Sequence, residues 1–260
     1  MMIEQKIKAF LDTQEGFTSI VVRSLVDDHA YAYEADRVMR SASTIKVFIM
    51  SELFRQAKEG LLSLSDKIVL TSSMLTGGDG VLKELNPGHE FTLEEICTLM
   101  IIQSDNMATN ILIDVLGMDN INVQISRLGM KNTSLQRKMM DSEAVKAGFN
   151  NYITANEFAA LLESIYRGNN VDACASKKML SILLRQQVRG RLDLYLPDEL
   201  LIAHKTGDLD NLEHDGGIVF LENSPYLICV MTEDVKTNKI GREIIGEVSR
   251  IVYEEFVGIN

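Results

Sequence analysis

The chain has 260 residues, of which 46% are hydrophobic and 24% charged, and its formal net charge is −11. This length is sufficient for a large core in one or two domains, and the composition is that of a soluble globular protein. Binding to a phosphate backbone requires a concentrated basic surface. The negative charge and the lack of any lysine or arginine cluster therefore predict that nucleic acid is not a partner.

The N-terminal segment, residues 2–12, has the spacing of a short amphipathic helix. Its charges interrupt any apolar stretch, so it lacks the pattern of a signal peptide. No run in the sequence approaches the roughly 18 apolar residues of a membrane span. We therefore expect no membrane span and a cytoplasmic location, unless a leader has been trimmed.

Strand-like patterns occupy both ends of the chain. Residues 17–25 and 29–36 are rich in β-formers around a turn, and three further strand-like segments follow late in the sequence, at 200–209, 214–221 and 225–233. Residues 238–256 form an amphipathic pattern with helical spacing. The strands at both ends predict one antiparallel sheet covered by the terminal helices.

The middle of the chain, from Ser43 to about Arg189, has helical periods that end at glycines 60, 117 and 168. The sequence thus predicts an α/β (α+β) fold with a discontinuous sheet domain and an all-helical domain. The predicted boundaries are 1–40 with 190–260 for the sheet domain and 41–189 for the helical domain. Pockets favour domain interfaces, so we expect the binding site in a groove between sheet and helices.

The cysteines and histidines give no sign of a metal site. The three cysteines are odd in number and widely spaced, at Cys97, Cys174 and Cys229, which favours buried reduced thiols over disulfides or zinc. The four histidines show no metal-ligand spacing. We therefore expect neither a metal nor another cofactor.

A first candidate motif is Ser43-Thr44-Ile45-Lys46, at the start of an apolar helical segment. Positions three apart share a helix face, so the hydroxyl of Ser43 and the amine of Lys46 can meet. Burial would lower the pKa of Lys46 toward a range in which its amine accepts a proton, and a serine nucleophile needs such a base. The alternative is a surface lysine whose stem covers apolar neighbours, and the motif alone does not decide between them.

Two further motifs carry hydroxyl and amine groups. Ser104-Asp105-Asn106 either marks a turn between two helices, with an acidic N-cap, or relays a proton and binds a substrate carbonyl. Lys205-Thr206-Gly207 ends a predicted strand, either as a simple turn or as an edge that pairs with a substrate. In the second reading Gly207 leaves room for close backbone approach.

In this order the three motifs are the set found in class A β-lactamases and penicillin-binding proteins. The chain resembles the class A β-lactamase family over nearly its whole length, and residues 91–113 resemble its helix-and-loop block, including Asn110. The resemblance implies a sheet with a helical lobe, a small β-lactam, amide or ester substrate and a role in antibiotic resistance. It implies that Ser43 is the acylated nucleophile, Lys46 its base, and Ser104 and Lys205 proton-transfer groups.

The resemblance also implies a substrate-binding set. Asn106 and Thr206 would contact the substrate, and the backbone N–H groups of Ser43 and Asp208 would form the oxyanion hole. Many members of the family bind the β-lactam carboxylate with an arginine where this chain has Glu213. Arg191 matches a position from which some members supply that arginine, although it also reads as a surface residue.

The chain departs from the family in the loop of residues 135–154. The loop's arginine is matched by Arg137 and its aspartate partner by Asn151, but Met139 stands where the family has the glutamate that positions the hydrolytic water. Asp141 and Glu143 either replace that carboxylate or are solvated loop charges. The sequence therefore predicts a β-lactamase-like serine hydrolase, with a penicillin-binding or sensor protein that acylates without efficient turnover as the alternative.

Overall fold

The computed structural model describes residues 3–258, and the chain divides into two compact units. The sheet unit consists of Met1–Thr44, Thr154–Glu163 and Arg189–Asn260. The helical unit consists of Ile45–Ile153 and Ser164–Val188. The predicted boundaries differ from these units mainly at residues 154–163, which group with the sheet.

The sheet unit contains a five-stranded antiparallel sheet with the strand order β2-β1-β9-β8-β7. Its strands are β1 (Phe17–Ser24), β2 (Ala30–Tyr33), β7 (Ile202–Leu209), β8 (Leu212–Val219) and β9 (Tyr226–Glu233). The pairing of β1 with β9 joins the N-terminal hairpin to the three C-terminal strands. The predicted sheet built from both ends of the chain is confirmed. The short β3 (Met39–Arg40) and the 3₁₀ helix η1 (Ala42–Ile45) follow β2.

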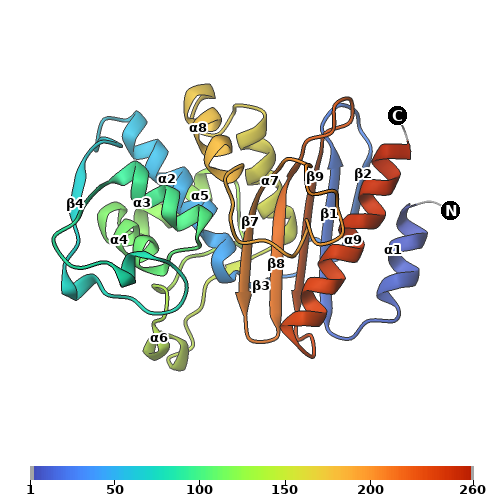
Figure 1. Ribbon diagram of the computed structural model, residues 1–260, viewed down its shortest axis with the longest axis horizontal. Coiled ribbons are helices and arrows are strands. Elements are labelled where there is room, and N and C mark those ends of the chain that lie inside the picture. The colour runs from blue at the N-terminus through green and yellow to red at the C-terminus, as the bar shows by residue number, and fades with distance from the viewer. Residues whose placement is uncertain (1–2, 259–260) are drawn as a thin grey trace. The chain divides into compact units, whose positions relative to one another are not determined.

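Helices α1 (Ile3–Leu11) and α9 (Asn238–Gly258) run side by side along one face of this sheet (Figure 1). Their apolar residues recur at helical spacing and pack on the sheet in one core cluster. Members of this cluster include Ile3, Ile7, Ile20, Tyr226, Ile228, Ile244, Val248 and Val252. Both predicted terminal helices are therefore confirmed, and the burial of their apolar stripes explains why they form.

The helical unit contains α2 (Lys46–Lys58), α3 (Leu93–Ile102), α4 (Asn106–Leu116), α5 (Met118–Arg127), α6 (Ser142–Lys146) and α8 (Ala173–Leu183). Its shorter elements are β4 (Lys67–Val69), β5 (Glu90–Thr92), β6 (Tyr152–Ile153), η2 (Ser72–Met74) and η3 (Leu82–Glu84), and β4 pairs with β5 antiparallel. Helix α7 (Ala155–Tyr166) begins in the sheet unit and ends in the helical unit. Three predicted stops are confirmed, since Gly60, Gly117 and Gly168 have φ values of 72°, 83° and 77° just after α2, α4 and α7.

Helix α2 is surrounded by α3, α4, α5 and α8. Val47, Phe48, Ile49 and Met50 are all fully buried, so the apolar run has no solvent-facing side at this point. Such a helix is hydrophobic all round because it is packed on all sides. Lys46 at its first position is consequently drawn into the interior rather than left on the surface.

The prediction for the cysteines holds at two of three positions. All three are free thiols, with Cys97 and Cys229 buried, and burial raises the pKa of both. The prediction was wrong for Cys174, which is exposed near the start of α8. The few residues that flank an isolated cysteine do not determine which way its side chain faces.

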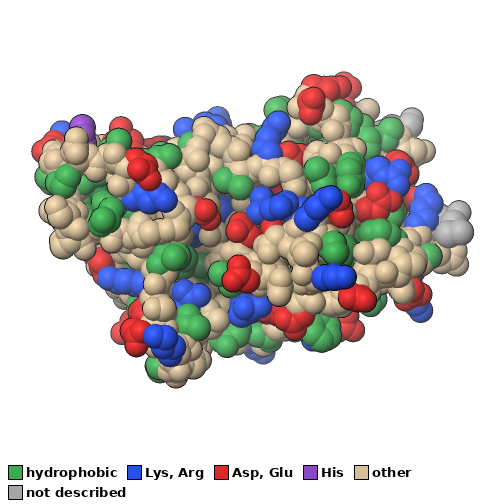
Figure 2. All heavy atoms as spheres, turned by 60° about the horizontal axis from the view of Figure 1, so that its bottom comes forward, with side chains coloured by type: hydrophobic (Ala, Val, Ile, Leu, Met, Phe, Trp, Pro, Cys, Tyr) green, Lys and Arg blue, Asp and Glu red, His purple; other side chains and the backbone are tan. Residues whose placement is uncertain are grey.

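Within residues 3–258, no helix combines the length and the apolar character that crossing a membrane requires. Acidic and basic side chains are interspersed on the face that Figure 2 presents. The absence of a nucleic-acid partner stays a prediction.

The second face of the sheet packs tightly against the first part of α7. A Cβ atom on Gly216 in β8 would lie 2.5 Å from Phe158 Cε1 and 2.7 Å from Cys229 Sγ. These three residues belong to the sheet unit and are closely packed, so a methyl group can enter only if the neighbours move.

We expect Gly216→Ala to lower the free energy of unfolding by about 1–3 kcal/mol, because overpacking forces side chains out of their rotamers. Urea denaturation measures the change. Gly258→Ala is the matched control, since a Cβ atom there would meet nothing within 4 Å. Equal stability of the two variants would contradict the packing described here.

Candidate active site

Ser43 lies in η1, directly before α2, and is 9% exposed. Strand β7, at the edge of the sheet, passes its backbone closely. A Cβ atom on Gly207 would lie 2.9 Å from the nitrogen of Ser43 and 3.0 Å from that of Thr44. Glycine at position 207 is therefore required by the close approach of β7 to the main chain around the serine.

Lys205 and Thr206 precede Gly207 on β7 and are both buried. The amine of Lys205 donates to the backbone oxygen of Thr206 over 2.7 Å. A buried ammonium is costly without such partners. Within the sheet unit, the structure thus places Lys-Thr-Gly on the strand that runs past Ser43.

In the helical unit, Lys46 is fully buried at the first turn of α2. Its Nζ lies 2.7 Å from the backbone oxygen of Ser104, 3.1 Å from Ser104 Oγ and 2.9 Å from Asn106 Oδ1. The structure therefore brings together Lys46, Ser104 and Asn106, three predicted site residues from two different motifs. The reading of Lys46 as a surface lysine is wrong, since the side chain is inside the unit.

The Ser-Asp-Asn turn has an unusual backbone conformation. Ser104 has a φ of 53°, in the left-handed region that non-glycine residues rarely adopt. This conformation points both the carbonyl and the hydroxyl oxygen of Ser104 at the amine of Lys46. Strained residues of this kind cluster at functional sites, where the surrounding structure holds them in place.

Asp105 stabilises this turn. From the sequence it was predicted only as an N-cap. Its Oδ1 accepts the N–H of Ala108 over 2.8 Å, which caps α4. Its Oδ2 accepts the N–H groups of Val81 and Leu82 over 2.6 and 2.8 Å. The glycine-rich loop of residues 76–82 is therefore bonded to the Ser-Asp-Asn turn.

Met139 is held by Asn110, one turn further along α4. Asn110 Oδ1 accepts the N–H of Met139 over 2.8 Å, and its Nδ2 donates to the oxygen of Met139 over 3.1 Å. A surface cavity of about 400 Å3 adjoins this point, lined by Leu75, Thr76, Gly77, Asn110, Lys138, Met139, Met140 and Asp141. The backbone of residue 139 is thus fixed, but its side chain cannot act as a proton acceptor.

Both acidic residues of the same loop have contacts of their own in the helical unit. Asp141 Oδ1 accepts the N–H of Ala144 over 2.9 Å and caps α6. The side chain of Glu143 is 81% exposed and pairs with Lys146 at 2.7 Å. Asp141 is thus a helix-capping residue and Glu143 a solvated loop charge, and replacement of the missing glutamate by either stays a prediction.

The expected partner of Arg137 needs correction. Its Nε donates to Asn150 Oδ1 over 3.1 Å, whereas Asn151 binds the backbone of the loop through the N–H groups of Gln136 and Arg137. The assignment of Asn151 as the guanidinium partner was wrong by one residue. Two consecutive asparagines gave no sequence signal that distinguishes them.

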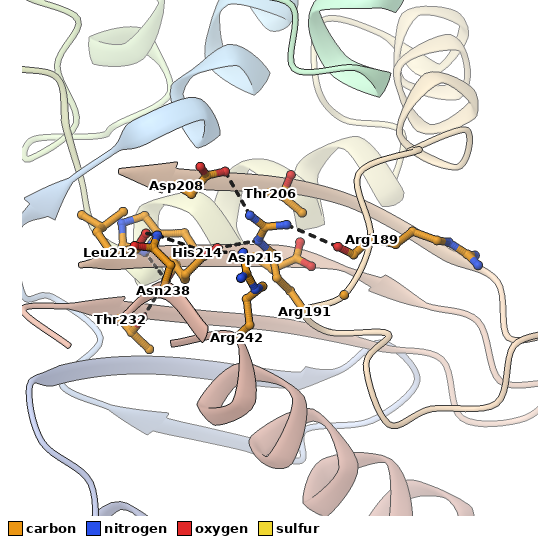
Figure 3. Close-up of polar contacts among 12 residues, drawn as sticks. Arg189, Arg191, Thr206, Asp208, Leu212, His214, Asp215, Thr232, Asn238 and Arg242 are labelled. Atoms are coloured by element: carbon orange, nitrogen blue, oxygen red, sulfur yellow. Dashed lines mark hydrogen bonds and ion pairs between the residues drawn. The ribbon is translucent and has the colours of Figure 1, made fainter. Parts of the chain in front are cut away.

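Arg191 lies in a network of ion pairs in the sheet unit (Figure 3). Its Nε donates to Glu213 Oε2 over 2.7 Å and its Nη2 to Asp208 Oδ1 over 2.9 Å. Glu213 also accepts from Arg242 and Asn238. Burial raises the pKa of the Glu213 carboxyl, and the Arg191 guanidinium opposes that effect. The reading of Arg191 as a surface residue is wrong, since its side chain is 5% exposed.

Within residues 3–258, no group of three or more histidine, cysteine or acidic side chains is arranged to hold a metal ion. The three motifs supply serine hydroxyls, buried lysines and backbone N–H groups. Ser-x-x-Lys at a helix start, Ser-Asp-Asn bonded to that lysine and Lys-Thr-Gly on an edge strand define the class of serine β-lactamases and penicillin-binding proteins.

Comparison with known proteins agrees with this class. Residues 2–256 match the β-lactamase enzyme family. β-Lactamase VEB-1 of Pseudomonas aeruginosa is 26% identical over 83% of this chain and 77% of its own length. β-Lactamase AER-1 of Aeromonas hydrophila is 26% identical over 67% of this chain, and the match spans 59% of its own length.

Solved structures give the same result. A β-lactamase from Sphaerobacter thermophilus has a TM-score of 0.90 and 29% identity, covering 99% of this chain and 97% of its own. PBP-A has a TM-score of 0.89 and 27% identity, covering 98% and 96%. The chain belongs to the β-lactamase enzyme family and is a β-lactamase-like serine hydrolase.

Because Ser104 has a left-handed backbone conformation, its effect on stability can be measured separately from its effect on catalysis. We expect Ser104→Gly to be more stable than Ser104→Ala by about 1 kcal/mol, because glycine adopts a positive φ without the Cβ clash. Both variants lose the hydroxyl beside Lys46, so both should lose β-lactam turnover. Urea denaturation and nitrocefin hydrolysis measure the two effects, and an alanine variant as stable as the glycine variant would contradict the strain.

Proposed function

We propose that the protein hydrolyses β-lactams or related small amides and esters through an acyl-enzyme on Ser43. The observation that carries this proposal is the bonding of the buried Lys46 amine to Ser104 and Asn106. It links the Ser-x-x-Lys motif to the Ser-Asp-Asn motif through a group that can move a proton.

Lys46 is proposed to act as the base that activates Ser43. The partners of its Nζ include two carbonyl oxygens, which can only accept, and Ser104 Oγ, which can accept or donate. A neutral amine has two N–H groups and one lone pair. Its N–H groups can therefore bond both carbonyl oxygens while its lone pair accepts a hydroxyl proton.

The proposed acylation begins with nucleophilic attack by Ser43. Ser43 Oγ attacks the substrate carbonyl carbon as Lys46 takes the hydroxyl proton. The bond to the leaving nitrogen or oxygen breaks, and Ser104, assisted by the charge of Lys205, returns a proton to the leaving group. The result is an ester between Ser43 and the acyl part of the substrate.

Substrate orientation is proposed to come from the remaining motif residues. Asn106 and Thr206 bind the substrate, and the backbone N–H groups of Ser43 and Asp208 stabilise the oxyanion. The close passage of Gly207 by the Ser43 nitrogen supports a main-chain origin for this stabilisation. Arg191, predicted to bind a substrate carboxylate, already has two carboxylates of the chain as partners, and its role stays a prediction.

Hydrolysis of the acyl-enzyme is proposed to be the slower half-reaction. In the family a loop glutamate positions the water for this step, and here Met139 occupies that position while Asp141 and Glu143 are engaged elsewhere. The family match and the β-lactamase relatives favour a hydrolase over a protein that acylates or binds without turnover. A cytoplasmic location and a role in antibiotic resistance stay predictions.

Ser43→Ala should abolish nitrocefin hydrolysis and the mass adduct formed with penicillin G, because the variant has no nucleophile. Steady-state absorbance and intact-mass spectrometry measure both effects. Ser72→Ala, which changes an exposed serine on η2, is the control and should behave as the unmodified protein. Turnover retained by Ser43→Ala would disprove the proposed acyl-enzyme.

Met139→Glu should shorten the lifetime of the Ser43 adduct by about tenfold or more, because a positioned general base typically contributes a factor of at least 10². Stopped-flow kinetics and time-resolved mass spectrometry follow the adduct. Met140→Glu is the matched control, since it adds the same charge to the adjacent residue, which is 60% exposed. An unchanged lifetime in Met139→Glu would show that release is limited by another step.

A further inference from the structure

The glycine-rich loop of residues 76–82 bonds the first residue of α4 at two points beyond the contacts of Asp105. The backbone N–H of Asn106 donates to the oxygen of Asp79 over 2.9 Å. The Nδ2 of Asn106 donates to the oxygen of Gly77 over 3.3 Å. The loop therefore contacts both the main chain and the side-chain amide of a residue that is proposed to bind substrate.

These contacts determine which way the amide of Asn106 faces. Its Oδ1 accepts from Lys46 Nζ over 2.9 Å, and its Nδ2 donates to the oxygen of Gly77. A rotation of the amide by half a turn would place Oδ1 against the oxygen of Gly77, so that two acceptors would meet without a proton. The amide nitrogen has two N–H groups, so the second can donate to a substrate carbonyl while the first bonds Gly77.

The main chain of Gly78 lies directly against this amide. A Cβ atom on Gly78 would lie 2.4 Å from Asn106 Nδ2 and 2.9 Å from Met140 Sδ. Its φ of 76° is in the left-handed region, which glycine adopts without strain. Glycine loses more conformational freedom on folding than any other residue, so a loop with glycines at positions 77, 78 and 80 needs bonds that hold it in place.

Lys83 supplies such a bond. It lies on η3, directly after the loop, and its amine donates to the oxygen of Gly78. A hydrogen bond from a charged donor is stronger than one between neutral groups. The ion pair of Lys83 with Glu84 is longer, at 3.8 Å, and the side chain of Glu84 is 73% exposed. The bond to Gly78 is therefore the stronger of these two contacts.

We propose that Lys83 is a positioning residue for the amide of Asn106. By holding the oxygen of Gly78, Lys83 keeps the adjoining carbonyl of Gly77 on the amide nitrogen. The amide oxygen then faces Lys46, and the second N–H group of the nitrogen is available to the substrate. The role of Asn106 in substrate binding rests here on the proposed function.

Two substrates separate this role from a general loss of structure. The oxygen of the reacting carbonyl is assigned to the oxyanion N–H groups of Ser43 and Asp208, so Asn106 binds a second carbonyl of the substrate. Penicillin G carries such a carbonyl in its side-chain amide, whereas 6-aminopenicillanic acid has the same reacting ring and lacks that amide. An effect that passes through Asn106 therefore depends on the side chain of the substrate, while damage to Ser43 or Lys46 slows both reactions.

The second-order rate constant of acylation is measured from the growth of the Ser43 adduct by quenched-flow mass spectrometry. Lys83→Met removes the amine and keeps the length of the side chain. It should lower the constant for penicillin G about fivefold and that for 6-aminopenicillanic acid less than about twofold. Lys83→Arg, which keeps a charged donor, should restore the value for penicillin G to within about twofold. In an Asn106→Ala background, Lys83→Met should change it by less than about twofold, because the two residues act in series.

Lys67→Met is the matched control, because it removes an exposed lysine on β4 in the same unit, and it should change neither constant. Equal losses for both substrates, no loss for penicillin G, or full additivity with Asn106→Ala would overturn the proposal. The proposed function fails in a different measurement, the absence of a Ser43 adduct on the unmodified protein with either substrate. The positioning is then tested by NMR of the Asn106 side-chain amide, whose resonances Lys83→Met should shift and Lys67→Met should not. Unshifted resonances in Lys83→Met would overturn it.

Discussion

The buried amine of Lys46 is the group on which much of the helical unit's local structure depends. An amine buried at the first turn of a packed helix is costly unless hydrogen-bond partners surround it. Ser104 and Asn106 do so, but Ser104 must adopt a left-handed backbone conformation to present both of its oxygens. Asp105 then stabilises the turn by bonding three backbone N–H groups on two segments.

Helix α4 positions Met139, the residue at which the chain departs from its family. Asn110 lies one turn after Asn106 on α4 and bonds both backbone groups of Met139. The loop is therefore held as a catalytic loop would be, although the side chain it presents is a thioether. Acylation and hydrolysis of the acyl-enzyme therefore depend on different groups. The groups proposed for attack on a carbonyl are present, whereas the group that would direct water is replaced.

In the sheet unit, charge rather than packing distinguishes the end of β7. A buried carboxylate such as Glu213 requires cations, and Arg191 and Arg242 supply them. Arg191 can then bond Asp208 as well, which fixes a carboxylate next to Gly207. The arginine that compensates the buried charge of Glu213 thus also holds the carboxylate of Asp208 at the edge of the sheet.

The sequence by itself determined the sheet, the two terminal helices and three helix stops, because apolar periodicity and glycine positions are local signals. It also predicted that Lys46, Ser104 and Asn106 belong to one site, and in the structure the amine of Lys46 bonds to the other two. The tertiary structure decided what depends on distant partners: that Asp105 bonds the backbone of residues 81 and 82, that Asn150 rather than Asn151 binds the guanidinium of Arg137, that Cys174 is exposed, and that Arg191 is bonded to Asp208 and Glu213. Side-chain bonds between residues far apart in sequence follow from the packing of whole elements, and no local pattern encodes them.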